Sequence, residues 1–215
     1  MNIIYIGTLH PHPGGSAISG SQIVENLAKG KNEVVAIGPI TSADLPEVAS
    51  INELIPGVDV RRYEVPYYNT STHDTHSEEY AANEVQSIQR LFASLKREFA
   101  PDIIFLGRET FAPLIPHFRK YAPIVLRVAG ATTLGIANSA FPVELANQYL
   151  REYGSADLLI SPAKHTAKFL MKKGLAHCVH IPNAVNTTKF SKLRVNSDLR
   201  NQLQVSPNEL IVAHI

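Results

Sequence analysis

The chain has 215 residues, of which 45% are hydrophobic and 18% are charged, and its formal net charge is +1. This composition is ordinary for a globular protein, and the length allows one large domain, or one domain and a fragment of another. The balanced charge gives no long-range reason to expect nucleic acid as a partner.

The compartment follows from cysteine content and hydropathy. The single Cys178 excludes an intrachain disulfide and a metal site built from cysteines alone, as suits a reducing cytoplasm. No run reaches the roughly 18 apolar residues that a membrane-spanning helix needs, and the opening MNIIYIG lacks the basic segment of a signal peptide. We therefore expect a cytoplasmic protein, with a peripheral membrane contact through a basic amphipathic helix left open.

The first thirty residues predict a strand, a long loop and a helix. Asn2–Gly7 is a short β-branched run bounded by glycine, which is typical of a buried parallel strand. Ser21–Gly30 has apolar residues at helical spacing and a glycine at its end. Thr8–Gly20 (TLHPHPGGSAISG) lies between them, and loops of this length are usually functional or disordered. We expect it to form the floor of a ligand site, because glycine lets the main chain approach a ligand and the next helix offers free N–H groups. An ordinary long connector is the alternative.

The glycine spacing in this loop narrows the class of ligand. Gly14 and Gly15 are adjacent and Gly20 follows five residues later, so the pattern is not GxGxxG. No lysine follows Gly20, so it is not a P-loop either. A nicotinamide cofactor and a P-loop nucleotide are both disfavoured.

The rest of the chain alternates predicted strands and helices. Further strands are expected at Glu33–Gly38, Val58–Val65, Asp102–Gly107, Pro123–Ala129, Asp157–Ser161 and Cys178–Ile181. Helices are expected at Ser77–Phe99, Phe111–Tyr121, Phe141–Tyr153, Ala163–Lys173 and, as a modest one, Ser197–Gln204, whereas Thr41–Pro56 is only weakly helical and Pro66–His76 and Gly130–Ser139 read as loops. This alternation predicts an α/β, Rossmann-like three-layer fold, a parallel sheet with helices on both faces. Glu209–Ile215 reads as the first strand of something further.

Polar residues follow two of the buried strands. Arg108 and Glu109 come directly after DIIFLG, and Arg127 interrupts the apolar run PIVLRVA. The carboxyl ends of parallel strands border the ligand crevice, so these side chains are candidate acceptor-binding groups. A structural ion pair of Arg127 with an acidic residue explains the pattern equally well, because buried charge is rare unless it is paired or functional. The Gly130–Ser139 segment also follows a predicted strand, so it should lie on the same side of the sheet as Thr8–Gly20, at the carboxyl ends of the strands.

A metal site is not expected. His73, Asp74, His76 and Glu78 are clustered in sequence. Their spacing matches neither zinc nor calcium patterns, and surface clusters of this kind are usually solvated.

Four segments resemble the retaining glycosyltransferases of family 4, which have the GT-B architecture. Ile181–Phe190 (IPNAVNTTKF) resembles the IPNGVDxxxF segment that ends their N-terminal half. PHPGGSAISG resembles their P-x-GG loop, SADLLISPAKHTAKFLMKKG their ADxVIxxSxxxxxxLxxxG strand and helix, and LRNQLQVSPNELIVAHI their passage into the second domain. The segments occur in the family's order and cover nearly the whole chain.

The resemblance implies two facing Rossmann-like domains. Residues 1–190 would be the acceptor-side domain, and residues 191–215 the linker and first strand of a C-terminal domain that binds a nucleotide-diphosphate sugar. Transfer to a saccharide or lipid acceptor would proceed with retention and without a metal or other cofactor. The chain alone should be inactive, because stabilising the leaving diphosphate needs groups from both walls of the cleft.

Within this interpretation, position along the chain gives the candidate residues. Gly14, Gly15 and Ser16 would face the donor phosphate or the transferred sugar. The acceptor-side candidates are His10, His12, Arg108, Glu109, Arg127, Gly130 and Thr132. For both His10 and His12, a surface histidine without a special role is the favoured alternative.

The sequence also departs from the family pattern. Many members carry a histidine where this chain has Ala129-Gly130, so no catalytic residue is assigned. Asn183-Ala184 also replaces the usual Asn-Gly. A non-catalytic stand-alone binding module is the alternative function, and a flavodoxin-like or epimerase-like enzyme complete in this chain is a third.

Overall fold

The computed structural model describes residues 1–12, 14–42, 55, 57–66, 78–187, 197–206 and 208–210, without the side chains of residues 78–82 and 197–199. The chain divides into a compact unit, Met1–Pro182, and a second unit, Asn183–Ile215.

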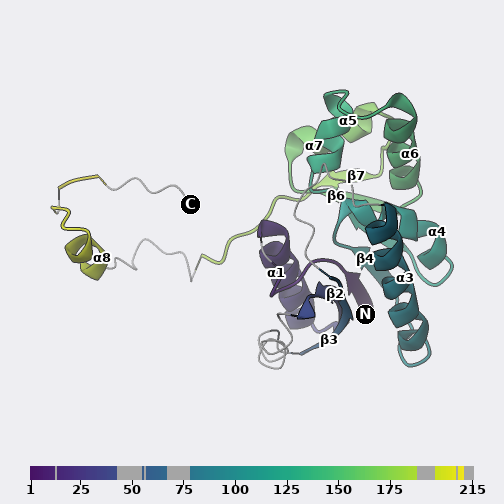
Figure 1. Cartoon of the computed structure of the whole chain (residues 1–215), viewed down its shortest axis with the longest axis horizontal. Coiled ribbons are helices and arrows are strands. Elements are labelled where there is room, and N and C mark those ends of the chain that lie inside the picture. Colours follow the sequence, from purple (N-terminus) through teal and green to yellow (C-terminus); the bar gives the residue numbers. More distant parts are fainter. Residues whose placement is uncertain are drawn as a thin grey trace. The chain divides into compact units, whose positions relative to one another are not determined.

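The first unit is built on a seven-stranded sheet in the order β3-β2-β1-β4-β5-β6-β7. Every neighbouring pair of strands is parallel. The strands are β1 (Asn2–Ile6), β2 (Glu33–Ile40), β3 (Val58–Glu64), β4 (Ile103–Leu106), β5 (Ile124–Arg127), β6 (Leu158–Ser161) and β7 (Cys178–His180). The helices are α1 (Gly15–Lys29), α3 (Glu78–Leu95), the 3-10 helix η2 (Glu109–Leu114), α4 (Ile115–Phe118), α5 (Ala131–Ala137), α6 (Val143–Gly154) and α7 (Lys164–Lys172), with α8 (Ser197–Gln202) in the second unit (Figure 1). The predicted Rossmann-like α/β fold is confirmed.

One face of the sheet carries the larger core. The strand register aligns Leu106, Leu126, Leu159 and Cys178 across β4 to β7, and all four side chains are buried. Helices α3, α4, α6 and α7 cover this face and contribute apolar side chains to the same cluster. Burying one such leucine contributes about 2 kcal/mol, so this row is a main source of stability.

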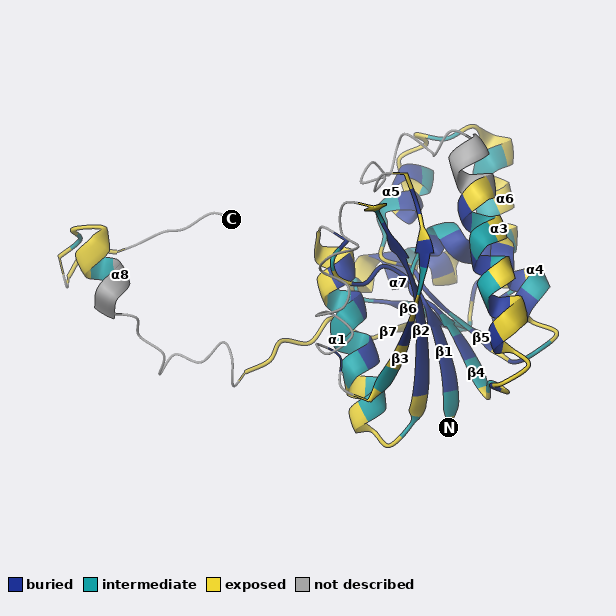
Figure 2. Cartoon of the chain, turned by 60° about the horizontal axis from the view of Figure 1, so that its bottom comes forward, coloured by how far each residue is buried: buried dark blue, intermediate teal, exposed yellow. Residues whose placement is uncertain are grey.

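The opposite face has a smaller core under α1 (Figure 2). Val24 of α1 is fully buried there, and the Tyr5 and Phe105 rings of β1 and β4 meet edge to face at 5.5 Å. Among the described residues, this cluster includes none from β5, β6 or β7. On this face β5 instead carries the buried Arg127.

Helix α1 begins earlier than the sequence pattern indicates, because the predicted loop Thr8–Gly20 already turns helical at Gly15. Its small residues Ala17 and Gly20 are buried against the sheet. A Cβ atom on Gly20 would lie 2.7 Å from the Tyr5 hydroxyl and still closer to the Thr8 carbonyl oxygen. Glycine there serves close packing of helix on strand, and this packing overrides the low helix propensity of the segment.

Two further segments differ from prediction. Gly130–Ser139, expected to be a loop, contains helix α5. Phe111–Tyr121, expected to be one helix, belongs to η2 followed by α4, because Pro113 and Pro116 lack the N–H donors of a regular helix.

Some predictions fall on residues outside the described ones. They are the cap at Ser77, nearly all of Thr41–Pro56 and Pro66–His76, and the last five residues of the Glu209–Ile215 strand. The modest helix predicted near Ser197–Gln204 is present as α8. None of the described helices is both long and apolar enough to cross a membrane.

Candidate functional site

The two polar rims predicted from sequence lie at one edge of the sheet. Since β1 and β5 run parallel, the segments that follow them leave from the same carboxyl edge. A direct contact confirms the arrangement: Arg127 Nη2 donates to Ser19 Oγ of α1 at 3.3 Å. This carboxyl edge is the candidate functional site.

The start of α1 is open to solvent. Gly14 has φ 97° and ψ 171°, a backbone conformation that only glycine adopts readily. A Cβ atom on Gly14 or Gly15 would meet nothing within 4 Å, and Ser16 is exposed. No side chain caps the helix. The first N–H groups and the positive end of a 15-residue helix are therefore available to an anion.

The loop before α1 is held by its backbone. The His10 N–H donates to Ser21 Oγ at 3.1 Å, and the His10 carbonyl accepts from Arg62 Nη2 at 2.5 Å. The His12 N–H donates to the Leu9 carbonyl at 3.0 Å. His10 is exposed, but only 7% of His12 is, so the surface interpretation is wrong for His12.

Arg127 lies on the α1 face of the sheet and is 5% exposed. Its charge, with that of Arg108, favours the phenolate of Tyr5, yet burial outweighs both and raises the pKa of Tyr5 to about 12. Tyr5 therefore stays neutral, and its ring fits between Gly7, Gly20 and Gly107, where added Cβ atoms would collide with it. Part of the glycine richness at this edge thus serves Tyr5.

Arg108 is engaged within the protein. It forms an ion pair with Glu84 of α3 at 3.3 Å and stacks over the Phe111 ring at 4.7 Å. Glu84 also accepts from the Tyr63 hydroxyl of β3 at 2.7 Å. Sequence reasoning missed Glu84, although it occupies the apolar stripe of α3, four residues before Ile88. An acidic residue in such a stripe signals a buried partner.

Three predicted acceptor-side residues bind one another. Glu109 is 5% exposed and accepts the N–H groups of Thr132 at 2.8 Å and of Gly130 at 3.3 Å. Burial raises the pKa of Glu109, while these hydrogen bonds oppose the shift. A Cβ atom on Gly130, whose φ is 117°, would lie 3.2 Å from Thr166 Oγ1 of α7. The chain's own carboxylate therefore occupies the start of α5.

The described residues contain no group of three side chains that could hold a metal ion. The cluster His73, Asp74 and His76 lies outside the described residues. Nothing in the described structure assigns a cofactor to this edge.

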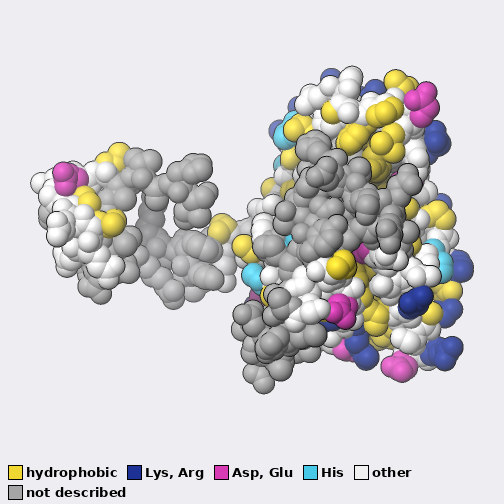
Figure 3. Space-filling model, in the orientation of Figure 1, with side chains coloured by type: hydrophobic (Ala, Val, Ile, Leu, Met, Phe, Trp, Pro, Cys, Tyr) yellow, Lys and Arg dark blue, Asp and Glu magenta, His cyan; other side chains and the backbone are white. Residues whose placement is uncertain are grey.

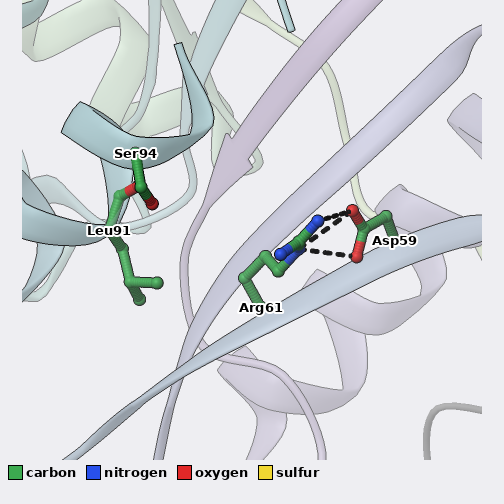
Figure 4. Close-up of polar contacts among 4 residues, drawn as sticks. All are labelled: Asp59, Arg61, Leu91 and Ser94. Carbon is green, nitrogen blue, oxygen red and sulfur yellow. Dashed lines mark hydrogen bonds and ion pairs between the residues drawn. The ribbon is translucent and has the colours of Figure 1, made fainter. Parts of the chain in front are cut away.

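A cavity of about 340 Å³ lies at the opposite, amino edge, between the starts of β2 and β3 and the end of α3. Its wall includes Asp59 and Arg61, whose side chains are joined by hydrogen bonds of 2.7–2.9 Å (Figure 4). None of the predicted site residues lines it.

No protein-family model matches the sequence, and no curated protein is a close relative. Solved structures share the fold. Sucrose-phosphate synthase from Thermosynechococcus elongatus superposes with a TM-score of 0.64 and 16% identity over 97% of this chain and 54% of that one. Apo UGT2 from Phytolacca americana superposes with a TM-score of 0.61 and 12% identity over 95% of this chain and 55% of that one.

A protein assigned as a UDP-N-acetylglucosamine 2-epimerase from Listeria monocytogenes gives a TM-score of 0.53 and 20% identity over 82% of this chain and 43% of that one. The chain thus spans about half the length of the structures it matches. At these identities the likeness is one of fold: the chain has the parallel α/β fold found in glycosyltransferases of the GT-B type.

Proposed function

We propose that this chain is the acceptor-side domain of a family 4 glycosyltransferase. The enzyme would transfer a sugar, with retention and without a metal, from a nucleotide-diphosphate sugar to a saccharide or lipid acceptor. The observation that carries the proposal is the juxtaposition of an uncapped α1 start, Gly14–Ser16, with the buried Arg127 at one sheet edge.

The residues of this edge fit a diphosphate. Gly14 and Gly15 place no side chain in the way, so phosphate oxygens can approach the first N–H groups of α1. The guanidinium of Arg127 lies beside the same helix and adds a fixed positive charge. Such preorganised positive groups stabilise charge on a leaving phosphate better than water does.

The comparisons support the ligand class. UGT2 has been solved with UDP-2-fluoro-glucose and pterostilbene, and LpCGTa with UDP. The epimerase likeness favours a second candidate, because its named substrate is also a UDP-sugar. Nucleotide-sugar chemistry is common to both, and the products distinguish them.

The test uses the full-length protein that contains this chain. We expect nucleotide release from one of a panel of UDP-, GDP- and ADP-sugars when saccharide or lipid acceptors are present, with product of unchanged anomeric configuration and equal rates in EDTA. Acceptor-independent isomerisation of the sugar would instead identify an epimerase. Binding of a nucleotide sugar without turnover would favour the non-catalytic module.

Two substitutions locate the activity. Arg127→Met should lower kcat/KM by about 10²-fold, the usual loss for one preorganised donor. Arg61→Met at the amino edge removes an exposed arginine of the same size and should leave kcat/KM unchanged. Equal effects of the two substitutions would contradict the assignment of the site. Turnover by the 215-residue chain alone would contradict the need for a second domain.

A further inference from the structure

Helix α7 belongs to a strongly basic part of the chain. Leu158–Pro182 contains four lysines and no acidic residue, whereas the remaining chain holds 16 basic and 19 acidic side chains. The near-zero net charge therefore conceals a local excess of positive charge around α7.

The helix places this charge on one side. Its buried residues, Thr166, Ala167 and Leu170, pack toward the sheet. Lys164, Lys168 and Lys172 recur every four residues and form an exposed row, with the exposed His165 beside it. Among the side chains that the structure describes, none forms an ion pair with these four.

Exposed apolar side chains accompany the row. Met171 of α7 is 44% exposed, Leu134 of α5 is 51% exposed and Val143 of α6 is 70% exposed. Helix α5 contacts α7, and its Gly135 packs against the ring of Phe141, two residues before Val143. Figure 3 shows hydrophobic side chains gathered over the α5–α6 part of the molecule. We call Leu134, Val143, Met171 and the lysine row the α5–α7 face.

We propose that the α5–α7 face binds the surface of an anionic lipid bilayer. Clustered lysines are attracted to anionic headgroups, and exposed leucine, valine and methionine side chains enter the headgroup boundary. The positive charge of the lysine row is complementary to such a surface. Glu144, next to Val143, is an acidic side chain that opposes it. A nucleic acid would use the lysines but would leave the apolar side chains without a role.

The position of this face narrows the class of acceptor, and this inference rests on the proposed glycosyltransferase function. Helix α7 follows β6 and so starts at the carboxyl edge, and its Thr166 lies against Gly130. A bilayer bound to the α5–α7 face would therefore border the candidate acceptor side. Of the two acceptor classes, this arrangement favours a lipid-borne acceptor over a soluble saccharide.

Vesicle sedimentation of the 215-residue chain tests the proposal. We expect binding to phosphatidylcholine vesicles that contain 30% phosphatidylglycerol, loss of binding in 0.5 M NaCl, and no binding to pure phosphatidylcholine. The triple variant K164A/K168A/K172A should weaken binding about 100-fold, from the usual contribution of each lysine near an anionic surface. The matched control K31A/K96A/K120A removes three exposed lysines elsewhere and should bind like the unaltered chain.

A second variant, L134S/M171S, keeps the charge and should also weaken binding, with circular dichroism verifying its fold. No binding to either vesicle, equal binding to both, equal losses in the two triple variants, or a higher affinity for duplex DNA than for the anionic vesicles would each overturn the proposal. Vesicle binding without sugar transfer by the full-length protein would refute the proposed function alone. Transfer to a soluble saccharide without vesicle binding would refute this face alone.

Discussion

Gly20→Ala tests whether the glycines of the first loop serve packing or a ligand. In the structure Gly20 lies inside α1, and a new Cβ atom would lie 2.7 Å from the Tyr5 hydroxyl and collide with the Thr8 carbonyl oxygen. The carbonyl belongs to the backbone and cannot rotate away, so α1 has to shift from β1. Overpacking of this kind costs about 1–3 kcal/mol.

Helix propensity works against that cost. Alanine in place of a helical glycine contributes about 1 kcal/mol of stability. Because the collision involves a backbone atom, the overpacking cost should lie near the upper end of its range, so we expect Gly20→Ala to be destabilising by about 2 kcal/mol. For a chain of this size, that corresponds to a fall in Tm of about 4–8 °C.

Gly15→Ala is the matched control within the same helix. A Cβ atom there meets nothing within 4 Å, so this substitution should leave stability unchanged or raise it by up to about 1 kcal/mol. Urea unfolding followed by circular dichroism measures both variants. If Gly20→Ala were as stable as Gly15→Ala, the close packing of Gly20 against β1 would be contradicted.

Three further substitutions test the carboxyl edge of the sheet. Because burial raises the pKa of Glu109, its contribution to stability is present below its unfolded-state pKa and is lost as pH rises through the folded-state value. Urea midpoints between pH 4 and pH 7 should therefore fall more for the unaltered chain than for Glu109→Gln, and parallel curves would contradict this. Glu84→Ala should lower the free energy of unfolding in urea by about 3 kcal/mol, because it leaves the largely buried Arg108 without its acidic partner. A loss below about 1 kcal/mol, the value of a surface ion pair, would show that solvent screens this pair. Gly14→Ala should cost about 1–3 kcal/mol, since its backbone conformation is essentially restricted to glycine, and a neutral result would mean that the loop adopts another conformation.

The outline of the fold could be predicted because its signals are local. Most of the strands are short runs rich in β-branched residues and leucine, as in NIIYI, IVLR and LLIS. Parallel pairing and right-handed connections then leave few possible topologies. From this alone, the convergence of the first loop and the Gly130 segment at one edge was predictable, and the contact of Arg127 with Ser19 confirms it.

The errors arose where packing overrides local preference. Small residues at the start of α1 and in α5 read as loops, yet both segments are helical in the structure. Gly20 is tolerated in α1 because it allows close approach to Tyr5, a residue many positions away. Helix propensity describes a residue outside its tertiary context, so it does not include the close packing of Gly20 against Tyr5.

By itself, the sequence determined the parallel sheet, the sheet edge on which its polar residues gather and the helices that connect its strands. Only the tertiary structure decided which partners those polar residues bind. It paired Arg108 with Glu84 and enclosed Glu109 with Gly130 and Thr132, but it left the start of α1 open beside Arg127. The physical reason is that a buried charge must find its partner wherever strand register and helix packing place one, and such partners lie far apart in the chain.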